Sequence, residues 1–521
     1  MNKNTIILIS VLIICFLIYK KEFNEIDNEY IKINNEISTK YNDLNKNNYG
    51  YGVSSSNEIA VNVGMSILDK GGNAVDAAIA ISYVLGVVEP YASGIGGGGG
   101  MLIYSPNNES IDFYNYRETA PIKSSGKASD VGVPGFVKGM EVVHKDYGTF
   151  DLKHLIEPAI YYAEKGFKIN KILSDRIYKS RYRLENSKIQ HFYKNNQFLD
   201  SGDILVQKEL ANTLRLIQNQ GSYIFYNGII SKCINTTTTI TAKDLNKYEV
   251  IKQQPVYGEY NGYEIISAPP PFSGITLIQI LKLYELSSSS YTNKKSYIDD
   301  MKKIADIAYK DRLGNIADSM FYKKNYDKLT TNEYIEYLYE KNFNIVKDKY
   351  EEEHESTTHF VVMDKDGMLV SCTNTLGNFW GSGIYIEGFF MNDNMKNFSK
   401  SNNSPNSYEQ GKRPRTFTSP TIIKNEESIM AIGSPGGNRI PQILAQVIID
   451  NIKFKSNIQD AIDAPRIIFE SDNQIKMEES SKFKYNMYFG SVHAIGFNSK
   501  MGIYGGTDKR RDGKISIKYN K

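Results

Sequence analysis

The stretch "EHESTTHFVVMDKDG", residues 353–367, combines two patterns that predict different chemistry. Its two histidines, with a glutamate directly after the first, suggest the metal-binding helix of a zinc protease. Its Thr357–Thr358 pair, followed by an apolar run, instead suggests a strand that starts at a nucleophile freed by cleavage of the chain. The choice between these hypotheses decides both the fold and the chemistry.

The spacing of the histidines disfavours the zinc hypothesis. A zinc protease helix carries histidines at positions i and i+4, but His359 follows His354 by five residues. At about 100° per residue, the two rings would lie roughly 140° apart around a helix. The Ser-Thr-Thr sequence and the β-branched residues after it also disfavour a helix. We therefore expect neither a metal site nor a cofactor.

A threonine becomes an effective nucleophile when it is the first residue of a chain. Its own α-amine then acts as the base, and the ordinary pKa of that amine, about 7.7–8.0, leaves a useful neutral fraction at working pH. An internal Thr357 would first have to be released by cleavage of the bond before it. Strands are rich in threonine, so a plain structural role for this pair stays open on these residues alone.

Bulk properties fit a globular protein. The chain has 521 residues, 41% hydrophobic and 23% charged, enough for one large domain or two or three ordinary ones. The net charge of +3 gives no argument for a nucleic-acid partner. Cys15, Cys233 and Cys372 show no disulfide or metal-ligand spacing, and we expect the last two to be small buried side chains.

The N-terminus carries a targeting signal. A lysine precedes the apolar run "TIILISVLIICFLIY", residues 5–19, and two lysines follow it. This run is short for a membrane span of about 20 residues but typical of a secretory signal. We expect residues 1–21 to be an export signal or anchor and residues 22–49 to be a polar tether. The rest would then work at the cell surface, with membrane contact only through the N-terminal segment.

Periodicity predicts helices first and strands later. Helical spacing covers residues 59–68 and 73–90, and the glycine run at 96–100 leads into a strand at 101–104 without the Gly-Lys-Ser/Thr of a phosphate loop. The stretch after Thr358 predicts a hairpin that turns at Asp366–Gly367. Other expectations are strands within 388–392, 420–434 and 474–479, helices at 151–167 and 441–452, and a solvated turn or edge at 235–241. Layers of helices and sheets follow.

Nine segments together resemble the gamma-glutamyltranspeptidase family, and they occur in order from residue 71 to residue 444. They read "GGNAVDAA", "SGIGGGG", "YRETAP", "GVPGFVKG", "EPAIYYAEKGF", "PPPFSG", "STTHFVVMDKDG", "GKRPRTFTSPT" and "GSPGGNRIPQIL". The likeness is strongest to the branch of capsule depolymerases that act on poly-γ-glutamate. Here "GIGGGGGMLI", "HESTTHF" and "SPGGNRIPQIL" read almost as that branch does.

The resemblance implies an α/β N-terminal-nucleophile fold, a four-layer αββα sandwich built by both products of self-cleavage. The cut would fall between Ser356 and Thr357, giving a large subunit, residues 50–356, and a small subunit, residues 357–521, that stay associated as one catalytic domain. Thr357 would attack the carbonyl of Ser356, and later the γ-carbonyl of a glutamyl substrate. Thr375 would hydrogen-bond the nucleophile.

The resemblance also implies the substrate contacts. Backbone N–H groups of Gly436 and Gly437 would face the oxyanion, where two adjacent glycines permit close approach. Arg117 would bind the substrate α-carboxylate through two parallel hydrogen bonds. The other implied substrate contacts are Asn394, Asn397 and Thr416. Arg439 and Arg511 are further candidates for binding an anionic polymer, with a structural role left open for each.

Three positions depart from glutathione-cleaving members. Gly377 stands where they have asparagine, Asn397 where they have the aspartate that neutralises a free α-ammonium, and Phe417 where they have a serine. A residue inside a γ-linked polymer carries its α-nitrogen as an uncharged amide, so an aspartate would gain no ion pair there. The departures therefore fit an internal polymer residue better than glutathione. They also fit a weakened or inactive relative.

We therefore expect a self-processing threonine enzyme that hydrolyses poly-γ-glutamate or transfers it to an amine. One alternative is a γ-glutamyltransferase or glutathione hydrolase that acts on small γ-glutamyl compounds. An alternative of another class is a non-catalytic surface binding protein, which would remain an uncut chain of 59.1 kDa.

Overall fold

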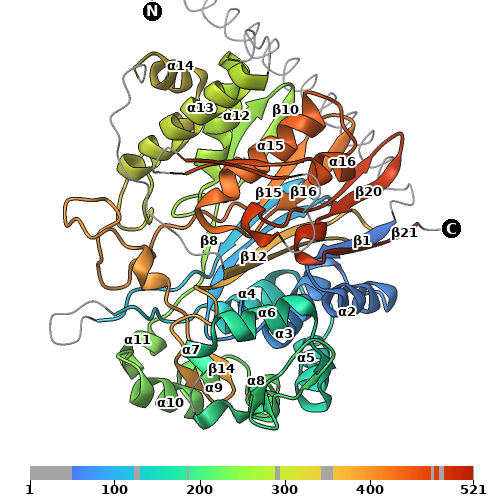
Figure 1. The fold of residues 1–521 in the computed structure, drawn as a ribbon, viewed down its shortest axis with the longest axis vertical. Coiled ribbons are helices and arrows are strands. Elements are labelled where there is room, and N and C mark those ends of the chain that lie inside the picture. The colour runs from blue at the N-terminus through green and yellow to red at the C-terminus, as the bar shows by residue number, and fades with distance from the viewer. Residues whose placement is uncertain are drawn as a thin grey trace, which may run out of the picture. The chain divides into compact units, whose positions relative to one another are not determined.

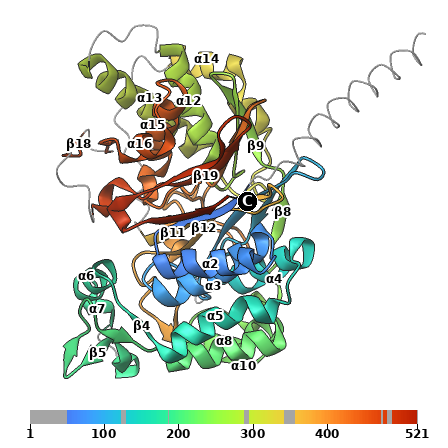
Figure 2. The ribbon, with the colours of Figure 1, turned by 90° about the vertical axis from the view of Figure 1, so that its right-hand side faces the viewer.

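Two β-sheets lie face to face in the computed structural model, and helices cover the outer side of each (Figures 1 and 2). The structure describes residues 50–122, 129–184, 187–287, 294–341, 356–470, 474–479 and 486–519. All of these belong to one compact unit, Tyr49–Asn520. The predicted signal, residues 1–21, and tether, residues 22–49, lie outside the described residues.

The first sheet has seven strands in the order β21-β1-β11-β12-β2-β3-β8, and each neighbouring pair is antiparallel. The strands are β1 (Tyr51–Ser55), β2 (Gly98–Ser105), β3 (Ser110–Asn115), β8 (Ile251–Gln253), β11 (Ser356–Met363), β12 (Leu369–Gly377) and β21 (Lys514–Lys518). The predicted hairpin is therefore the centre of this sheet.

The second sheet has six strands in the order β20-β19-β16-β15-β10-β9, also antiparallel throughout. The strands are β9 (Val256–Tyr260), β10 (Tyr263–Ser267), β15 (Thr421–Lys424), β16 (Ser428–Gly433), β19 (His493–Asn498) and β20 (Gly502–Thr507).

Helices cover the outer face of the first sheet. They are α2 (Glu58–Asp69), α3 (Ala74–Val88), α4 (Phe136–Tyr147), α5 (Leu152–Lys165) and α8 (Lys208–Gln220). Helix α3 begins with a capping box between Asn73 and Asp76, and its alanines and aliphatic residues are buried on nearly all sides. It lies directly against β11 and β12.

A second helical layer covers the other sheet. It consists of α12 (Gly274–Ser287), α13 (Lys294–Asn315), α14 (Asn332–Lys341), α15 (Ile440–Ile452) and α16 (Ile458–Asp463). Helix α12 contacts β9 and β10, while α13 and α14 pack on α12. Figure 1 shows this layer above the sheets and the α2–α5 layer below them.

The remaining elements connect these layers. Those on the α8 side are β4 (Phe167–Lys168), α6 (Lys171–Lys179), α7 (Arg181–Leu184), η1 (Ser187–Phe192), β5 (Tyr193–Lys194), β6 (Gln197–Phe198), β7 (Ile204–Leu205), α9 (Tyr223–Tyr226), α10 (Ile229–Thr237) and α11 (Ala242–Asn246). The others are η3 (Asp327–Thr330), β13 (Tyr385–Ile386), β14 (Phe389–Phe390), η4 (Asn394–Asn397), η5 (Gly437–Arg439), β17 (Ile467–Phe469), β18 (Ile475–Met477), η6 (Met487–Phe489) and η7 (Lys509–Arg511).

Alternation along β11 explains the layering. Phe360 and Val362 belong to the core between the first sheet and its helices, whereas Val361 and Met363 belong to the core between the two sheets. Both faces of this strand are therefore buried, as its nearly continuous apolar sequence requires. The arrangement is the four-layer αββα sandwich that was predicted.

Most predicted elements are confirmed, and two details are wrong. The hairpin turns where Asp366–Gly367 predicted, with Gly367 at φ +87°. The threonine tract at 235–241 is not one turn, because α10 runs to Thr237 and Thr241 caps α11. Cys372 is buried as expected, but Cys233 is only partly buried and donates to Glu387 at 3.4 Å. No helix within the described ranges is long and apolar enough to cross a membrane.

Candidate active site

The Ser356–Thr357 peptide bond lies at the start of β11, in the centre of the first sheet, and both residues are buried. The pairing with β12 shifts between them, so that Ser356 lies opposite Gly377 and Thr357 lies opposite Thr375. A shift of this kind bends the strand and redirects its side chains. The bond before Thr357 is thereby set apart from the regular ladder that follows.

The hydroxyl of Thr375 joins the two sides of this bond. It donates to the carbonyl oxygen of Ser356 at 2.6 Å and accepts from the Thr357 hydroxyl at 3.3 Å. It also accepts from the backbone N–H of Gly377 at 3.0 Å. One side chain therefore polarises the carbonyl that would be attacked and contacts the oxygen that would attack it.

Backbone contacts hold Ser356 from the opposite side. Its hydroxyl donates to the carbonyl oxygen of Tyr91 at 2.5 Å, and the backbone N–H of Trp380 donates to the same oxygen at 3.0 Å. Tyr91 follows α3, while Trp380 belongs to the loop after β12. This loop and the end of α3 therefore meet beside the candidate cleavage bond.

Arg511 lies behind Thr357. Its guanidinium donates to the carbonyl oxygen of Thr357, to Glu89 at 2.8 Å and to the Tyr91 hydroxyl at 3.3 Å. Burial works to lower the pKa of Arg511, but the charges of Glu89 and Tyr91 outweigh it and leave that pKa raised. With 1% of its side chain exposed and an ion pair to Glu89, Arg511 has the structural contacts that the sequence left open as an alternative to polymer binding.

Gly436 and Gly437 form a turn between β16 and α15. Their φ angles of 145° and 61° are ones that residues with side chains rarely adopt, so glycine is required at both positions. Strand β16 ends at Gly433, directly against the imidazole of His359 in β11. The turn therefore follows a strand that ends against His359, which lies two residues after Thr357 in the sequence.

Arg117, Glu118 and Asn394 form a buried polar cluster. Arg117 donates to the carbonyl oxygens of Pro414 at 2.8 Å and Arg415 at 3.1 Å, and its guanidinium lies 3.9 Å from Glu118. Asn394 donates to the other carboxylate oxygen of Glu118 at 2.7 Å. Burial raises the pKa of Glu118 to about 7 despite the opposing charge of Arg117.

Glu118 was missed by the sequence interpretation. The "YRETAP" segment drew attention to its arginine, while a glutamate after an arginine is usually a surface group. The structure makes it a buried member of the same cluster as two predicted substrate-binding residues. The signal that could have identified Glu118 was its position in the sequence, directly between Arg117 and the "TAP" residues, which are buried.

The other predicted substrate contacts have partners of their own. Thr416 is buried, and its hydroxyl lies 3.2 Å from that of Thr418. Asn397 is partly buried, and its carbonyl oxygen accepts from Asn406 at 2.7 Å. The guanidinium of Arg439 stacks on the ring of Tyr488 at 4.3 Å.

Two of the departing residues have clear packing reasons. A side chain at Gly377 would place its Cβ 2.3 Å from the Asp393 carboxylate, and the φ of +96° also favours glycine. Phe417 lies between Tyr309 and the guanidinium of Arg312, which is 3.6 Å from the ring centre. Both positions are therefore adapted to neighbours within this chain.

His359 lies in strand β11 and therefore does not belong to a zinc-binding helix. Its ring contacts Thr373 at 2.8 Å, and burial, with His493 nearby, holds its pKa well below the usual range. His354 and Glu355 lie outside the described residues. Within the part of the chain that the structure describes, no three or more His, Cys, Asp or Glu side chains form a group suited to a metal ion.

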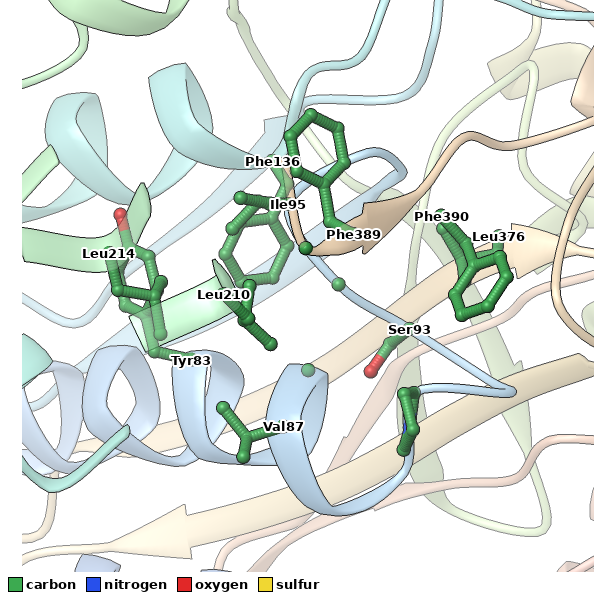
Figure 3. Close-up of a pocket in the computed structure, with 14 residues that line it drawn as sticks. Tyr83, Val87, Ser93, Ile95, Phe136, Leu210, Leu214, Leu376, Phe389 and Phe390 are labelled. Atoms are coloured by element: carbon green, nitrogen blue, oxygen red, sulfur yellow. The ribbon is translucent and has the colours of Figure 1, made fainter. Parts of the chain in front are cut away.

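A small apolar cavity lies on the helical side of β12 (Figure 3). Its volume is about 20 Å³, which is room for a water molecule. The lining consists mainly of apolar side chains, among them Tyr83, Val87, Leu210, Leu376, Phe389 and Phe390. A glutamyl group needs charged or hydrogen-bonding partners, so this cavity is not a glutamyl site.

Comparison with known proteins gives consistent matches. The family model described as gamma-glutamyltranspeptidase matches residues 60–517. The chain is 42% identical to the capsule biosynthesis protein CapD proenzyme of Bacillus anthracis, over 89% of this chain and 90% of that protein. It is 32% identical to the glutathione hydrolase proenzyme of Bacillus subtilis strain 168, over 82% of each.

Solved structures agree. The crystal structure of the transpeptidase enzyme CapD from Bacillus anthracis is 43% identical with a TM-score of 0.50, and its matched chain covers 56% of this chain and 99% of its own length. Cephalosporin acylase from Bacillus halodurans has a TM-score of 0.79 at 24% identity, over 90% of this chain and 96% of that one. The second likeness concerns the fold alone.

Proposed function

The chain belongs to the gamma-glutamyltranspeptidase family of enzymes, and from this premise we propose that Thr357 is the nucleophile of a self-processing enzyme that acts on poly-γ-glutamate. The contact of Thr375 with both Thr357 and the carbonyl of Ser356 carries this proposal. Two relatives named as proenzymes support the processing step. A solved CapD chain that spans only 56% of this chain also fits an enzyme made of two pieces.

Processing would begin at the Thr357 hydroxyl. Its oxygen attacks the carbonyl carbon of Ser356, while Thr375 hydrogen-bonds the carbonyl oxygen as negative charge develops there. The peptide C–N bond breaks, the proton lost by the hydroxyl passes to the nitrogen to give the α-amine of Thr357, and an ester to Ser356 remains. Water then hydrolyses this ester, leaving a carboxylate on Ser356 and a free hydroxyl on Thr357.

The freed amine would serve the second reaction. It accepts the proton of the Thr357 hydroxyl as the oxygen attacks a γ-glutamyl carbonyl, and Gly436 and Gly437 offer backbone N–H groups to the oxyanion. The leaving amine departs with that proton, leaving a γ-glutamyl ester. Water or an acceptor amine then discharges the ester and restores Thr357.

The uncharged residue at position 397 supports a polymer substrate. Asn397 is uncharged, and the carboxylate nearest to Gly377, Asp393, accepts from Lys396 at 3.2 Å. Inside a γ-linked polymer the α-nitrogen is an amide and needs no counter-charge. The higher identity to CapD than to the glutathione hydrolase of Bacillus subtilis strain 168, 42% against 32%, points the same way.

One observation favours a second candidate, hydrolysis of small γ-glutamyl compounds such as glutathione. Glu118 is a buried carboxylate beside Arg117, and one of its oxygens has no hydrogen-bond partner among the described residues. An ionised Glu118 would suit the free α-ammonium of such a substrate.

Turnover separates the two candidates. Purified enzyme is given poly-γ-glutamate, glutathione and a γ-glutamyl anilide, and kcat/KM is measured for each along with the length of the polymer. We expect the enzyme to shorten the polymer. We also expect kcat/KM, calculated per chain end or per internal bond, to be highest for the polymer. A strong preference for glutathione would make the second candidate correct.

We also propose that the enzyme works outside the cytoplasm, on the basis of the apolar run at residues 5–19. Fractionation of cells that produce the full chain should place it at the cell surface, and protease added to intact cells should digest it. Protection from that protease would contradict this proposal.

A further inference from the structure

A basic arm, residues 171–184, borders the candidate active site. Its sequence "KILSDRIYKSRYRL" carries five lysines and arginines and one carboxylate, Asp175, which pairs with Lys171 at 3.0 Å. The arm comprises α6 and α7, which lie at one side of the helical layer in Figure 2. It has no role in the chemistry proposed above.

Apolar residues anchor the arm and turn its charges outward. Ile172, Leu173, Ile177 and Leu184 are buried, following the helical period of α6 and its continuation into α7. Lys179 and Arg181 are exposed as a result, and so are the two tyrosines that flank them, Tyr178 and Tyr182. The outer face of the arm therefore combines cations with aromatic rings.

Arg176 ties the arm to the loop that follows β12. Its guanidinium lies 3.9 Å from the ring centre of Phe379, and its carbonyl oxygen accepts from the indole of Trp380 at 3.3 Å. Arg183 donates to the carbonyl oxygen of Gly381. The same loop shares the Tyr91 carbonyl with Ser356, so the arm lies one loop away from the candidate cleavage bond.

Arg176 also contacts the segment that packs beside the glycine turn. Its guanidinium contacts the sulfur of Met487 at 3.1 Å, and the next residue, Tyr488, stacks under Arg439. Gly490, two residues after Tyr488, packs against Gly436. The arm is therefore linked through Met487 and Tyr488 to the glycine turn and to Arg439.

The outer cations are held over aromatic rings. Arg181 lies 4.9 Å above the ring of Tyr178, and Arg183 lies 5.5 Å above that of Tyr182, with these rings 63% and 68% exposed. A guanidinium that rests on a ring loses less freedom when it binds an anion. Two guanidinium groups of the arm are thus held close to exposed rings.

We propose that the basic arm binds the α-carboxylates of poly-γ-glutamate residues beyond the one that Thr357 attacks. This inference rests on the proposed function. A γ-linked chain carries one free carboxylate per residue, so it can contact Lys179, Arg181 and Arg183 in turn. Each exposed ion pair is weak, but several along one polymer add up, and salt screens them. A glutamyl compound of one or two residues does not reach the arm.

The test reverses two exposed charges of the arm, Lys179→Glu with Arg181→Glu. We expect KM for poly-γ-glutamate to rise at least about fivefold at low salt, with the difference shrinking as salt is added. Turnover of a γ-glutamyl anilide should stay within about twofold of the unmodified enzyme. The matched control is Lys232→Glu with Lys243→Glu on α10 and α11, which changes the same charge at exposed positions away from the arm.

Equal KM values for the polymer in the reversed and unmodified enzymes would overturn the proposal, as would an equal rise in the control. A binding measurement distinguishes failure of the proposal about the arm from failure of the proposed function. Labelled poly-γ-glutamate is titrated into Thr357→Ala protein with and without the reversal. If the enzyme does not shorten the polymer, the proposed substrate is wrong. Weaker binding after reversal would still support the arm, and unchanged binding would overturn it.

Discussion

At the scale of single residues, the candidate chemistry depends on one hydroxyl with two partners. Thr375 donates to the Ser356 carbonyl at 2.6 Å and receives the Thr357 hydroxyl at 3.3 Å. Arg511 holds the carbonyl on the other side of Thr357. The residue that would become the new N-terminus is thus fixed on both sides before any cleavage, and little rearrangement is needed for attack.

Replacement of Thr375 tests this arrangement. Thr375→Ala removes the donor to the Ser356 carbonyl, and loss of one such donor typically costs a factor of about 10²–10³ in rate. We expect processing to slow by that order, measured as the decay of the uncut chain on denaturing gels. Thr375→Ser keeps the hydroxyl and should process within about tenfold of the natural rate. Equal rates for the alanine and serine variants would show that the hydroxyl is not used.

Glu118 gives a pH prediction at the same scale. Its pKa is raised to about 7 in the folded protein, above its ordinary value of 4.5, because burial disfavours the charged form. Its protonated form therefore favours the fold below about pH 4.5, and this contribution is lost as the pH rises toward 7. We expect Glu118→Gln to flatten the pH dependence of unfolding free energy between these values. Urea unfolding in a Thr357→Ala background measures it, and parallel pH profiles for both proteins would contradict the assignment.

At the scale of elements, the β11–β12 hairpin was predictable, whereas strands β1 and β20 were not. An alternating apolar run on each side of Asp366–Gly367 predicts two strands and their turn from local sequence. Strands β1 and β20 read "YGVSS" and "GIYGGT", whose glycines and serines are typical of loops. They form because distant strands pair with them, and β1 lies between β11 and β21.

The same distinction applies to the site. Thr357, Thr375 and the glycine turn could be predicted because each belongs to a characteristic segment. Glu118, Glu89 and Tyr91 could not, since their contacts join parts of the chain far apart, as with Ser356 and Tyr91, which are 265 residues apart. Arg511 is an example, because its sequence left polymer binding and a structural role open and its buried pairing with Glu89 could not be predicted.

Packing between the two sheets can be tested at Gly433, the last residue of β16. A Cβ there would lie 2.2 Å from the His359 ring, so Gly433→Ala forces the strands apart. Overpacking of this kind typically costs about 1–3 kcal/mol of unfolding free energy. We expect a loss of that size by urea unfolding in a Thr357→Ala background.

Gly314 in α13 provides the control for this substitution. A Cβ at this position has no neighbour within 4 Å, so Gly314→Ala should be neutral or stabilise the protein by up to about 1 kcal/mol. Equal effects of the two substitutions would mean that the contact between β16 and β11 is not tight.

At the scale of the whole molecule, both sheets contain strands from each side of the candidate cut. In the first sheet, β1 lies between β21 and β11, and β2 pairs with β12. In the second, β10 pairs with β15. Cleavage at Ser356–Thr357 would therefore leave two pieces whose backbones are hydrogen-bonded to each other across both sheets.

This interleaving predicts that the processed pieces do not separate. Processed protein should elute from a sizing column as one species, with the same volume as uncut Thr357→Ala protein. Only denaturant should divide it into two chains, because separation requires both sheets to open. Dissociation under native conditions would contradict the shared sheets.

The most direct test of the account is the covalent state of the purified protein. Intact mass and N-terminal sequencing should find two chains, the smaller beginning at Thr357, while Thr357→Ala protein stays a single uncut chain without γ-glutamyl transfer or hydrolysis. If the unmodified protein stayed uncut before Thr357 and still turned over γ-glutamyl substrates at full rate, the central claim would be wrong.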